Sequence, residues 1–265
     1  MSKSVYKKFW ILLLRSLFLI SGFYVSCSAQ VIAVPAIRAK GLPEVTYTLL
    51  YPAKNPKVTL LFIPGGPGST GLGPNHKDLK NHSTFMLREL ALSNELRSEV
   101  NVVIFDNPTK MDFGYRGVQP RYADDHLARI EDVVQFYKHK TGLPVWLMGH
   151  SNGTISVTEY INRSEQNAQN VAGLILSGSR AEITLNKKIN TPLLMLHHQT
   201  DQCSGTPYAA AQNNYVKLKV LGSAVSEFKT ILGGEAAGNP CSDGFHMYRG
   251  AYSEATRHIE FFVLR

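Results

Sequence analysis

Short apolar runs alternate with helical patterns along the chain from about Val45 onward. Continuous apolar runs of this kind, bounded by glycine, proline and polar residues, are typical of strands buried on both faces of a parallel sheet. The predicted strands are Val45 to Tyr51, Val58 to Gly66, Val100 to Asp106, Pro144 to Gly149, Ala172 to Gly178, Pro192 to His198 and Phe228 to Leu232. The first two lie so close together that they are expected to form a hairpin, with the segment YPAKNPK as its turn.

Between these runs, apolar residues recur at intervals of three and four. The clearest case is residues 124–142, where Asp124 or Asp125 can cap the start of a helix and Gly142 can end it. Further helices are predicted at residues 154–163, 208–219 and 252–263. Strand and helix in alternation predict an α/β protein with an open, mostly parallel twisted sheet and helices on both faces.

The N-terminal segment has the three parts of a secretory signal: the basic stretch MSKSVYKK, the apolar run FWILLLRSLFLISGFYV and the small residues SCSAQ. Cleavage after residue 29 would leave Gln30 as the new N-terminus. Alternatively, Cys27 resembles the acceptor cysteine of a bacterial lipoprotein, although Tyr24 stands where that pattern has an aliphatic residue, and its lipidation would tether the protein to a membrane. Soluble export, to the periplasm or medium, is the favoured ending, and residues 30–265 are expected to form one domain.

Charge gives no support to nucleic-acid binding. The net charge of +8 includes four basic residues of the leader, and without them the chain carries 24 basic and 20 acidic residues, a net charge of +4 with no cluster of Lys and Arg. Removal or lipidation of Cys27 would leave Cys203 and Cys241 as an even pair. In an oxidising compartment that pair is expected to form a disulfide, with two buried free thiols as the alternative.

The stretch VWLMGHSNGTISV contains a G-x-S-x-G pattern, Gly149 to Gly153, between a predicted strand and a predicted helix. A serine on so tight a turn has a strained backbone, and the neighbouring chain has to pass without meeting side chains, which explains a glycine on each side. The helix N-terminus behind Ser151 favours developing negative charge. Ser151 is therefore a candidate nucleophile, and the alternative is a glycine-rich turn with a solvated serine.

In this pattern and position the chain resembles the α/β-hydrolase family from about Val45 to its C-terminus. The resemblance implies a Ser, Asp or Glu, and His triad in that chain order. Asp201 follows a predicted strand, where the family places its acid, and Glu182 and Asp106 are weaker candidates. His246, between the last predicted strand and the final helix, is expected to be the general base, because His197 and His198 lie on a strand and His258 lies within a helix.

The segment FIPGGPGST follows an early strand, where the family carries a glycine-rich oxyanion loop, and Pro64 replaces the leading histidine of that motif. Pro67 has no N–H, so the expected donors to the oxyanion are Gly66, in preference to Gly65, and the Asn152 amide. A Cys203–Cys241 bond would join the loops that carry acid and base. On the chain-entropy model such a bond stabilises the fold by about 3 to 4 kcal/mol.

Three functions remain open on the residues alone. The first is an exported serine hydrolase that cleaves small carboxylic esters or other acyl substrates through an acyl-enzyme, at an open site with no large cap, since only SRAEITLNKKINT separates two strands where many relatives insert one. The second is a small serine exopeptidase, because PGGPG resembles the loop of prolyl aminopeptidases. The third is a catalytically silent binding module. No metal or cofactor is expected, because no ligand cluster or nucleotide loop is visible.

Overall fold

The structure is a computed structural model that describes residues 28–74, 82–108, 119–185, 188–223 and 226–265. The predicted leader, including Cys27, therefore lies outside the described residues except for its last two positions. No helix in the described part of the chain combines the length and the apolar character needed to cross a bilayer.

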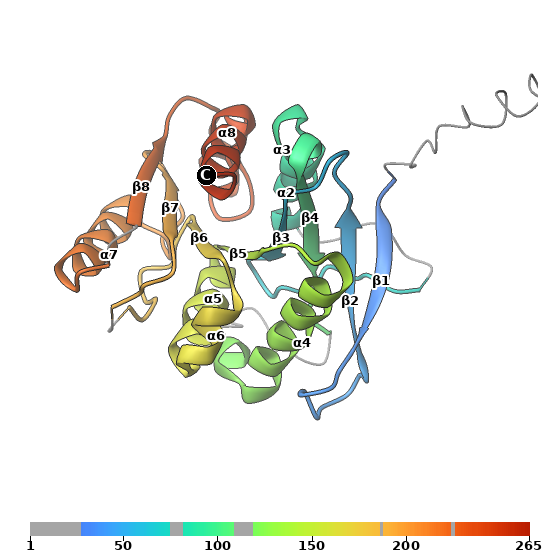
Figure 1. Cartoon of the computed structure of the whole chain (residues 1–265). Coiled ribbons are helices and arrows are strands. Elements are labelled where there is room, and N and C mark those ends of the chain that lie inside the picture. Colours follow the sequence, from blue (N-terminus) through green and yellow to red (C-terminus); the bar gives the residue numbers. More distant parts are fainter. Residues whose placement is uncertain (1–27, 75–81, 109–118, 186–187, 224–225) are drawn as a thin grey trace, which may run out of the picture.

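Eight strands form one twisted sheet in the order β1-β2-β4-β3-β5-β6-β7-β8 (Figure 1). The strands are β1 Gln30–Pro35, β2 Val45–Tyr51, β3 Val58–Ile63, β4 Val100–Phe105, β5 Val145–His150, β6 Gly173–Ser177, β7 Leu193–His198 and β8 Ser226–Ile231. The β1–β2 and β2–β4 pairs are antiparallel, and every other neighbouring pair is parallel. The parallel strands place their carboxyl ends at one edge of the sheet, which is where a chain of this topology can gather functional side chains.

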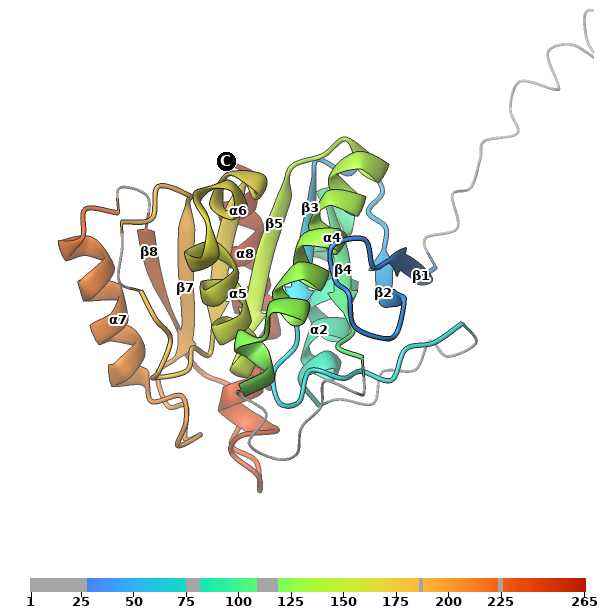
Figure 2. The ribbon, with the colours of Figure 1, turned by 90° about the horizontal axis from the view of Figure 1, so that it is seen from below.

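Helices cover both faces of this sheet (Figures 1 and 2). They are α2 His82–Leu92, α3 Asn94–Glu99, η2 Gln119–Tyr122, α4 Asp124–Thr141, α5 Asn152–Arg163, α6 Glu165–Asn170, α7 Tyr208–Val220, η3 Gly244–Met247 and α8 Tyr252–Val263. The α4 to α7 helices lie on one face, and α2, α3 and α8 lie on the other (Figure 1). No helix occurs among the described residues between β6 and β7, so the fold has no large cap there.

Two hydrophobic cores follow from the alternation of side chains along the central strands. In β3, Leu61 and Ile63 pack on the face covered by α4 and α5, whereas Leu60 and Phe62 pack on the face covered by α2 and α8. Successive side chains of a strand point to opposite faces, so a strand between two helical layers has to be apolar throughout. All six residues of β3 are buried, as the continuous apolar run predicted.

Each predicted strand and helix is present, with ends shifted by a few residues. The hairpin prediction is wrong, because β4 lies between β2 and β3 and pairs with both of them. The antiparallel partner of β2 on its other side is β1, a strand that was not predicted. Every residue of β4 is buried, so its backbone N–H and C=O groups have to pair with a strand on each side. The β2 and β3 strands fill these two places and therefore do not pair with each other, although they are close in the sequence.

The cap of α4 also differs from the expectation. Its N-cap is Ala123, which makes no side-chain cap bond, and the carboxylates of the first turn bind elsewhere. Asp124 pairs with Arg163, and Asp125 accepts the Gly41 N–H at 2.7 Å. At the other end Gly142 has a φ of 66° and ends the helix as predicted.

Candidate active site

Ser151 occupies a sharp turn between β5 and α5. Its φ of 52° and ψ of −123° put a non-glycine residue in a conformation that costs about 1 to 3 kcal/mol. Hydrogen bonds hold the turn: the Ser151 N–H donates to the Ser177 carbonyl at 3.0 Å, and the Thr154 N–H donates to the Ser151 carbonyl at 2.9 Å. The surrounding fold therefore fixes a strained serine at the carboxyl edge of the sheet.

The two glycines of the G-x-S-x-G pattern are required by close backbone packing. A Cβ atom on Gly149 would lie 2.3 Å from the Gly153 carbonyl oxygen, and one on Gly153 would lie 2.1 Å from the Ile63 carbonyl oxygen. Both neighbours are backbone atoms that cannot move aside as the end of a side chain can. The first turn of α5 thus packs directly on β5 and on the end of β3.

Asp201 and His246 come together from segments that are far apart in the sequence. Asp201 follows β7, His246 lies in η3 after β8, and the His246 Nδ1 is 2.7 Å from the Asp201 Oδ2. Both side chains are almost fully buried. An imidazole that donates from Nδ1 to a carboxylate carries its lone pair on Nε2, so His246 is oriented as a base.

Three more donors surround the Asp201 carboxylate. The Cys203 N–H donates to Oδ1 at 2.9 Å, the Thr206 hydroxyl donates to Oδ2 at 3.0 Å, and the His197 Nε2 lies 3.2 Å from Oδ2. Burial by itself would raise the pKa of Asp201, but the hydrogen bonds from His197 and His246 outweigh it and hold that pKa below its ordinary value. The acid is therefore ionised at neutral pH.

Two histidine rings lie side by side next to the turn that carries Ser151. The ring of His150, the residue before Ser151, has its centroid 4.7 Å from that of His246. The structure thereby brings Ser151, Asp201 and His246 into one neighbourhood. The buried His246 Nε2 makes no hydrogen bond within the described residues, so it is not bonded to the Ser151 hydroxyl. Such contacts are often long before a substrate is bound.

A chain of hydrogen bonds sets the tautomer of His150. The Tyr248 hydroxyl donates to the Leu196 carbonyl at 2.9 Å and lies 2.7 Å from the Ser177 hydroxyl, which must therefore donate to it. With its proton used, Ser177 can only accept from the His150 Nδ1 at 3.0 Å. Burial, and next the repulsion from His246, hold the pKa of His150 well below its ordinary value, so this ring is neutral.

The glycine-rich loop after β3 lies against the nucleophile. A Cβ atom on Gly65 would be only 2.8 Å from the Ser151 Cβ, so the loop backbone and the serine are in direct contact. The Gly66 carbonyl accepts from the Asn152 side-chain amide at 3.0 Å. Among the described residues, no acceptor is bonded to the backbone N–H of Gly66 or of Asn152. The Gly66 and Asn152 N–H groups, the two expected oxyanion donors, are thus not bonded to the described residues, and each belongs to a residue next to the contact between Gly65 and Ser151.

Other polar residues near this edge have structural roles. Asp106, a weaker candidate for the acid, accepts the N–H groups of Thr70 and Leu72, and burial raises its pKa. It anchors the far end of the glycine-rich loop. Glu182, the other weak candidate, is paired with Arg180 on the surface and is not part of the Asp201–His246 pair.

Cys203 and Cys241 form the predicted disulfide. Cys203 is two residues after Asp201, and Cys241 is five residues before His246. The bond therefore joins the loop that carries the acid to the loop that carries the base. Cys203 thus binds the acid through its backbone N–H and the loop of His246 through its side chain.

Sequence reasoning missed the residues that support these side chains, namely Arg121, His126, His150, His197, Thr206 and Tyr248. Arg121 donates to two carbonyls of the glycine-rich loop, and His197 and Thr206 both contact Asp201. The only local signal was the spacing of His197 four residues before Asp201. The others depend on contacts between distant segments.

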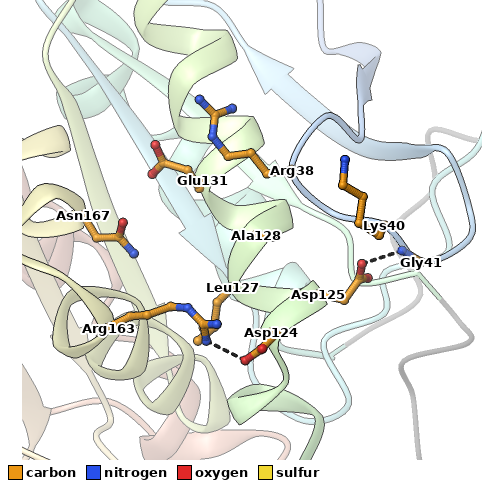
Figure 3. Close-up of a pocket in the computed structure, with 10 residues that line it drawn as sticks. All are labelled: Arg38, Lys40, Gly41, Asp124, Asp125, Leu127, Ala128, Glu131, Arg163 and Asn167. Carbon is orange, nitrogen blue, oxygen red and sulfur yellow. Dashed lines mark hydrogen bonds and ion pairs between the residues drawn. The ribbon is translucent and has the colours of Figure 1, made fainter.

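A separate hollow of about 670 Å³ lies on the outer side of α4 (Figure 3). Its walls carry both signs of charge, and Figure 3 shows two of the contacts among them: Arg163 with Asp124 at 2.7 Å, and the Gly41 N–H with Asp125 at 2.7 Å. Arg163 is the last residue of α5, whereas Ser151 precedes its first. This hollow is thus distinct from the site around the serine.

Searches with the sequence found no matching protein-family model and no matching curated protein. Solved structures do match. An α/β serine hydrolase without a lid from Xanthomonas campestris has 15% identity and a TM-score of 0.56, over 90% of this chain and 94% of that one. A dienelactone hydrolase from Anabaena variabilis has 11% identity and a TM-score of 0.58, over 89% and 97%. The protein Est1E from Butyrivibrio proteoclasticus, solved with ferulic acid, has 16% identity and a TM-score of 0.57, over 88% and 98%.

These similarities extend along nearly the whole of each matched chain. Together with the strand order and the serine turn, they establish that this chain has the α/β-hydrolase fold. Within that fold, the described residues between β6 and β7 form no large cap, in agreement with the prediction from the short connecting segment.

Proposed function

We propose that this protein is a serine hydrolase that cleaves carboxylic esters through an acyl-enzyme. Ser151 is the nucleophile, His246 the general base and acid, and Asp201 the orienting carboxylate. The observation that carries the proposal is the 2.7 Å bond between Asp201 and the His246 Nδ1. The His246 ring in turn contacts the ring of His150, which directly precedes a serine held at positive φ. A serine hydroxyl becomes an effective nucleophile only when a positioned imidazole can take its proton.

In the first half of the reaction, the Ser151 Oγ attacks the ester carbonyl carbon while the His246 Nε2 accepts the hydroxyl proton. The imidazolium then gives this proton to the departing alkoxide as the C–O bond breaks, leaving an acyl-serine. Water repeats the same steps and releases the acid. Asp201 stabilises the imidazolium, and the neutral His150 ring next to it adds no like charge.

The negative charge on the carbonyl oxygen is met by the N–H groups of Gly66 and Asn152. Each donor of this kind is worth roughly 3 kcal/mol of transition-state stabilisation. Asn152 is also the first residue of α5, so the partial positive charge at the N-terminus of this helix acts in the same direction.

Several features favour an ester over a peptide as the substrate. The described residues between β6 and β7 form no cap that could enclose the N-terminus of a peptide, and an amide demands better-placed proton donation to its leaving group than an ester does. The similar structures include a dienelactone hydrolase and an esterase from an Arctic intertidal metagenomic library. A small-molecule ester is therefore the proposed substrate class, and a small exopeptidase and a silent binding module are the alternatives to be tested.

Export is part of the proposal. The basic, apolar and small-residue segments of the leader support it, and the Cys203–Cys241 disulfide is the kind of bond that persists in an oxidising compartment. The intact mass of the mature protein tests it directly. A chain that begins at Gln30 supports soluble export, a lipid-modified Cys27 supports a membrane tether, and an uncleaved chain contradicts both.

The central test is mass spectrometry of the purified protein before and after reaction with a fluorophosphonate, in parallel with Ser151→Ala. The expected result is one adduct on Ser151 that is absent from the variant. A well-folded protein that forms no adduct would contradict the nucleophile assignment and favour the binding module. For a protein that labels, faster turnover of a p-nitrophenyl ester than of an aminoacyl anilide supports the esterase, and the reverse supports the exopeptidase.

A further inference from the structure

Arg121 is a fully enclosed cation beside the proposed site. It lies in η2, only 1% of its surface is exposed, and its guanidinium reaches the glycine-rich loop on one side and α5 on the other. A buried charge is tolerated only where hydrogen bonds replace its lost hydration. The contacts of this group therefore indicate what the fold retains it for.

One nitrogen of Arg121 binds two carbonyls of the same loop. Its Nη2 donates to the Pro64 carbonyl and to the Gly66 carbonyl, each at 3.0 Å. The carbonyl between them, on Gly65, accepts the Gly68 N–H at 3.0 Å. Three successive carbonyls are thus held: the Gly65 carbonyl, which belongs to the peptide unit that carries the Gly66 N–H, and the carbonyls of the peptide units on either side of it.

The other terminal nitrogen connects the same guanidinium to α5, the helix that follows Ser151. Nη1 of Arg121 donates to the Ser156 hydroxyl at 3.0 Å, and the His126 Nε2 lies 2.8 Å from that hydroxyl. Since Ser156 accepts from Arg121, its own proton is free to be donated to His126. The flat fork of the guanidinium therefore bridges the loop and α5 at a set spacing, which the single ammonium of a lysine cannot do.

The loop is also shaped to admit this side chain. A Cβ atom on Gly68 would lie 2.6 Å from the Arg121 Nη2 and 2.1 Å from the Asn107 Nδ2, and Gly68 has a φ of 84°. Another side chain would meet both of these groups there. Glycine at this position is thus explained by its positive φ and by the approach of Asn107 and of the guanidinium.

We propose that Arg121 is a positioning residue for the oxyanion hole: by holding the carbonyls of Pro64 and Gly66 and the hydroxyl of Ser156, it fixes the direction of the Gly66 N–H relative to Ser151. This assignment rests on the proposed function, because it specifies how one of the proposed donors is held. Loss of the brace leaves the donor present but free to turn. Misplacement of a catalytic group by about 1 Å can lower the rate on the order of 100-fold.

The test compares Arg121→Lys and Arg121→Gln with the wild type and with Arg163→Gln. Arg163 is a matched control, because it is a surface arginine, paired with Asp124 at 2.7 Å, at the opposite end of α5 from the serine. The first readout is kcat on a p-nitrophenyl ester, divided by the fraction of sites that a fluorophosphonate titrates to completion. The second is the ratio of the inhibition constants of a methyl ketone and of the trifluoromethyl ketone with the same side group, which forms an oxyanion adduct on serine.

Both Arg121 variants are expected to lose on the order of 10- to 100-fold in kcat per titrated site, with KM changed little. The preference for the trifluoromethyl ketone should fall by a similar factor, because it measures binding of the oxyanion itself. Arg163→Gln should match the wild type in both readouts. A merely structural arginine would lower the titrated fraction and leave kcat per site and the ketone ratio unchanged, and that result overturns the assignment.

Ser156→Ala covers the case in which the Arg121 variants do not fold. It removes one hydroxyl that anchors the guanidinium and should lower kcat per site and the ketone ratio together by about 3- to 10-fold, the worth of one hydrogen bond. An unchanged ratio in folded Ser156→Ala contradicts the proposed positioning role of Arg121. A wild type that neither labels at Ser151 nor binds the trifluoromethyl ketone overturns the proposed function itself, whereas a labelled wild type with unaltered variants overturns only the role of Arg121.

Discussion

Acidification should destabilise this protein through two buried neutral histidines, His126 and His150. Both are fully enclosed, with exposures of 1% and 0%. Burial is the main reason why the pKa of each is well below the ordinary value of 6.5, and the nearby charges of Arg121 and Arg129 add to the effect at His126. Neither ring should carry a proton in the folded state under mildly acidic conditions.

The direction of the pH effect on stability follows from the number of protons bound in the folded and the unfolded state. Below about pH 6.5 each of these histidines binds a proton in the unfolded chain but not in the folded one, so the free energy of unfolding falls as the pH is lowered, until the folded pKa is reached. One proton corresponds to a slope of up to about 1.4 kcal/mol per pH unit, and the pair to about 2.7 kcal/mol. This slope is large compared with the total free energy of unfolding of a domain, which is roughly 5 to 15 kcal/mol.

Urea unfolding at a series of pH values between about 7.5 and 5 measures this slope. His126→Gln keeps an acceptor near the position of Nε2 for Ser156, and His150→Asn keeps a donor near the position of Nδ1 for Ser177, but neither new side chain takes up a proton. Each variant should lose up to about 1.4 kcal/mol per pH unit of slope, and the double variant the sum.

Contributions from other groups, such as the partly buried His198, are common to all the proteins and cancel in the comparison. A variant that unfolds with the wild-type pH slope would show that its histidine takes up as many protons folded as unfolded. That result would refute the reasoning for that ring.

Substitutions at the proposed acid, in the turn that carries Ser151 and at the disulfide should also have measurable effects. Asp201→Asn should lower kcat on an ester by about 10⁴-fold because an amide no longer fixes the His246 tautomer, and a loss below tenfold would contradict the assignment. Gly153→Ala should destabilise the fold by more than about 4 kcal/mol in urea unfolding, while Gly238→Ala, whose added Cβ meets nothing within 4 Å, should not. Replacing Cys203 and Cys241 together by serine should cost about 4 kcal/mol for a sequence separation of 38, and equal stability would refute the entropic estimate.

The sequence allowed the main elements to be predicted because their signals are local. Apolar runs marked β2 to β8, and periodicity marked α4 and α8. The β1 strand was missed although its sequence, QVIAVP, contains four apolar residues in succession. It follows directly after the predicted leader, and all of its residues except Val34 are exposed or half-buried at the sheet edge. The α3 and α6 helices are six residues long and mostly polar, so their apolar faces are too small to show a period.

The same distinction applies to the candidate site, where residues with a local or family signal could be predicted and residues held by contacts between distant segments could not. Ser151 was visible because its turn requires glycines at fixed offsets, and Asp201 and His246 because the family order says where to look. Arg121 gave no such sign: it reaches Pro64 across 57 residues of sequence, and nothing local distinguishes it from a surface arginine. The supports of a site are chosen by which segments meet in space, and one sequence records that only indirectly.

The polar groups around the proposed triad are arranged so that each proton has one place to go. Tyr248 gives its proton to the Leu196 carbonyl, which leaves Ser177 to donate to Tyr248 and His150 to donate to Ser177. On the other side, Asp201 can only accept, so His246 must donate to it from Nδ1. Burial keeps His150 neutral, and the bond to Asp201 leaves His246 with its free lone pair on Nε2, the nitrogen that a base for Ser151 has to use. A proton accepted there meets an ionised carboxylate on one side and an uncharged ring on the other, so the fold stabilises the charge only at the position where the proposed reaction creates it.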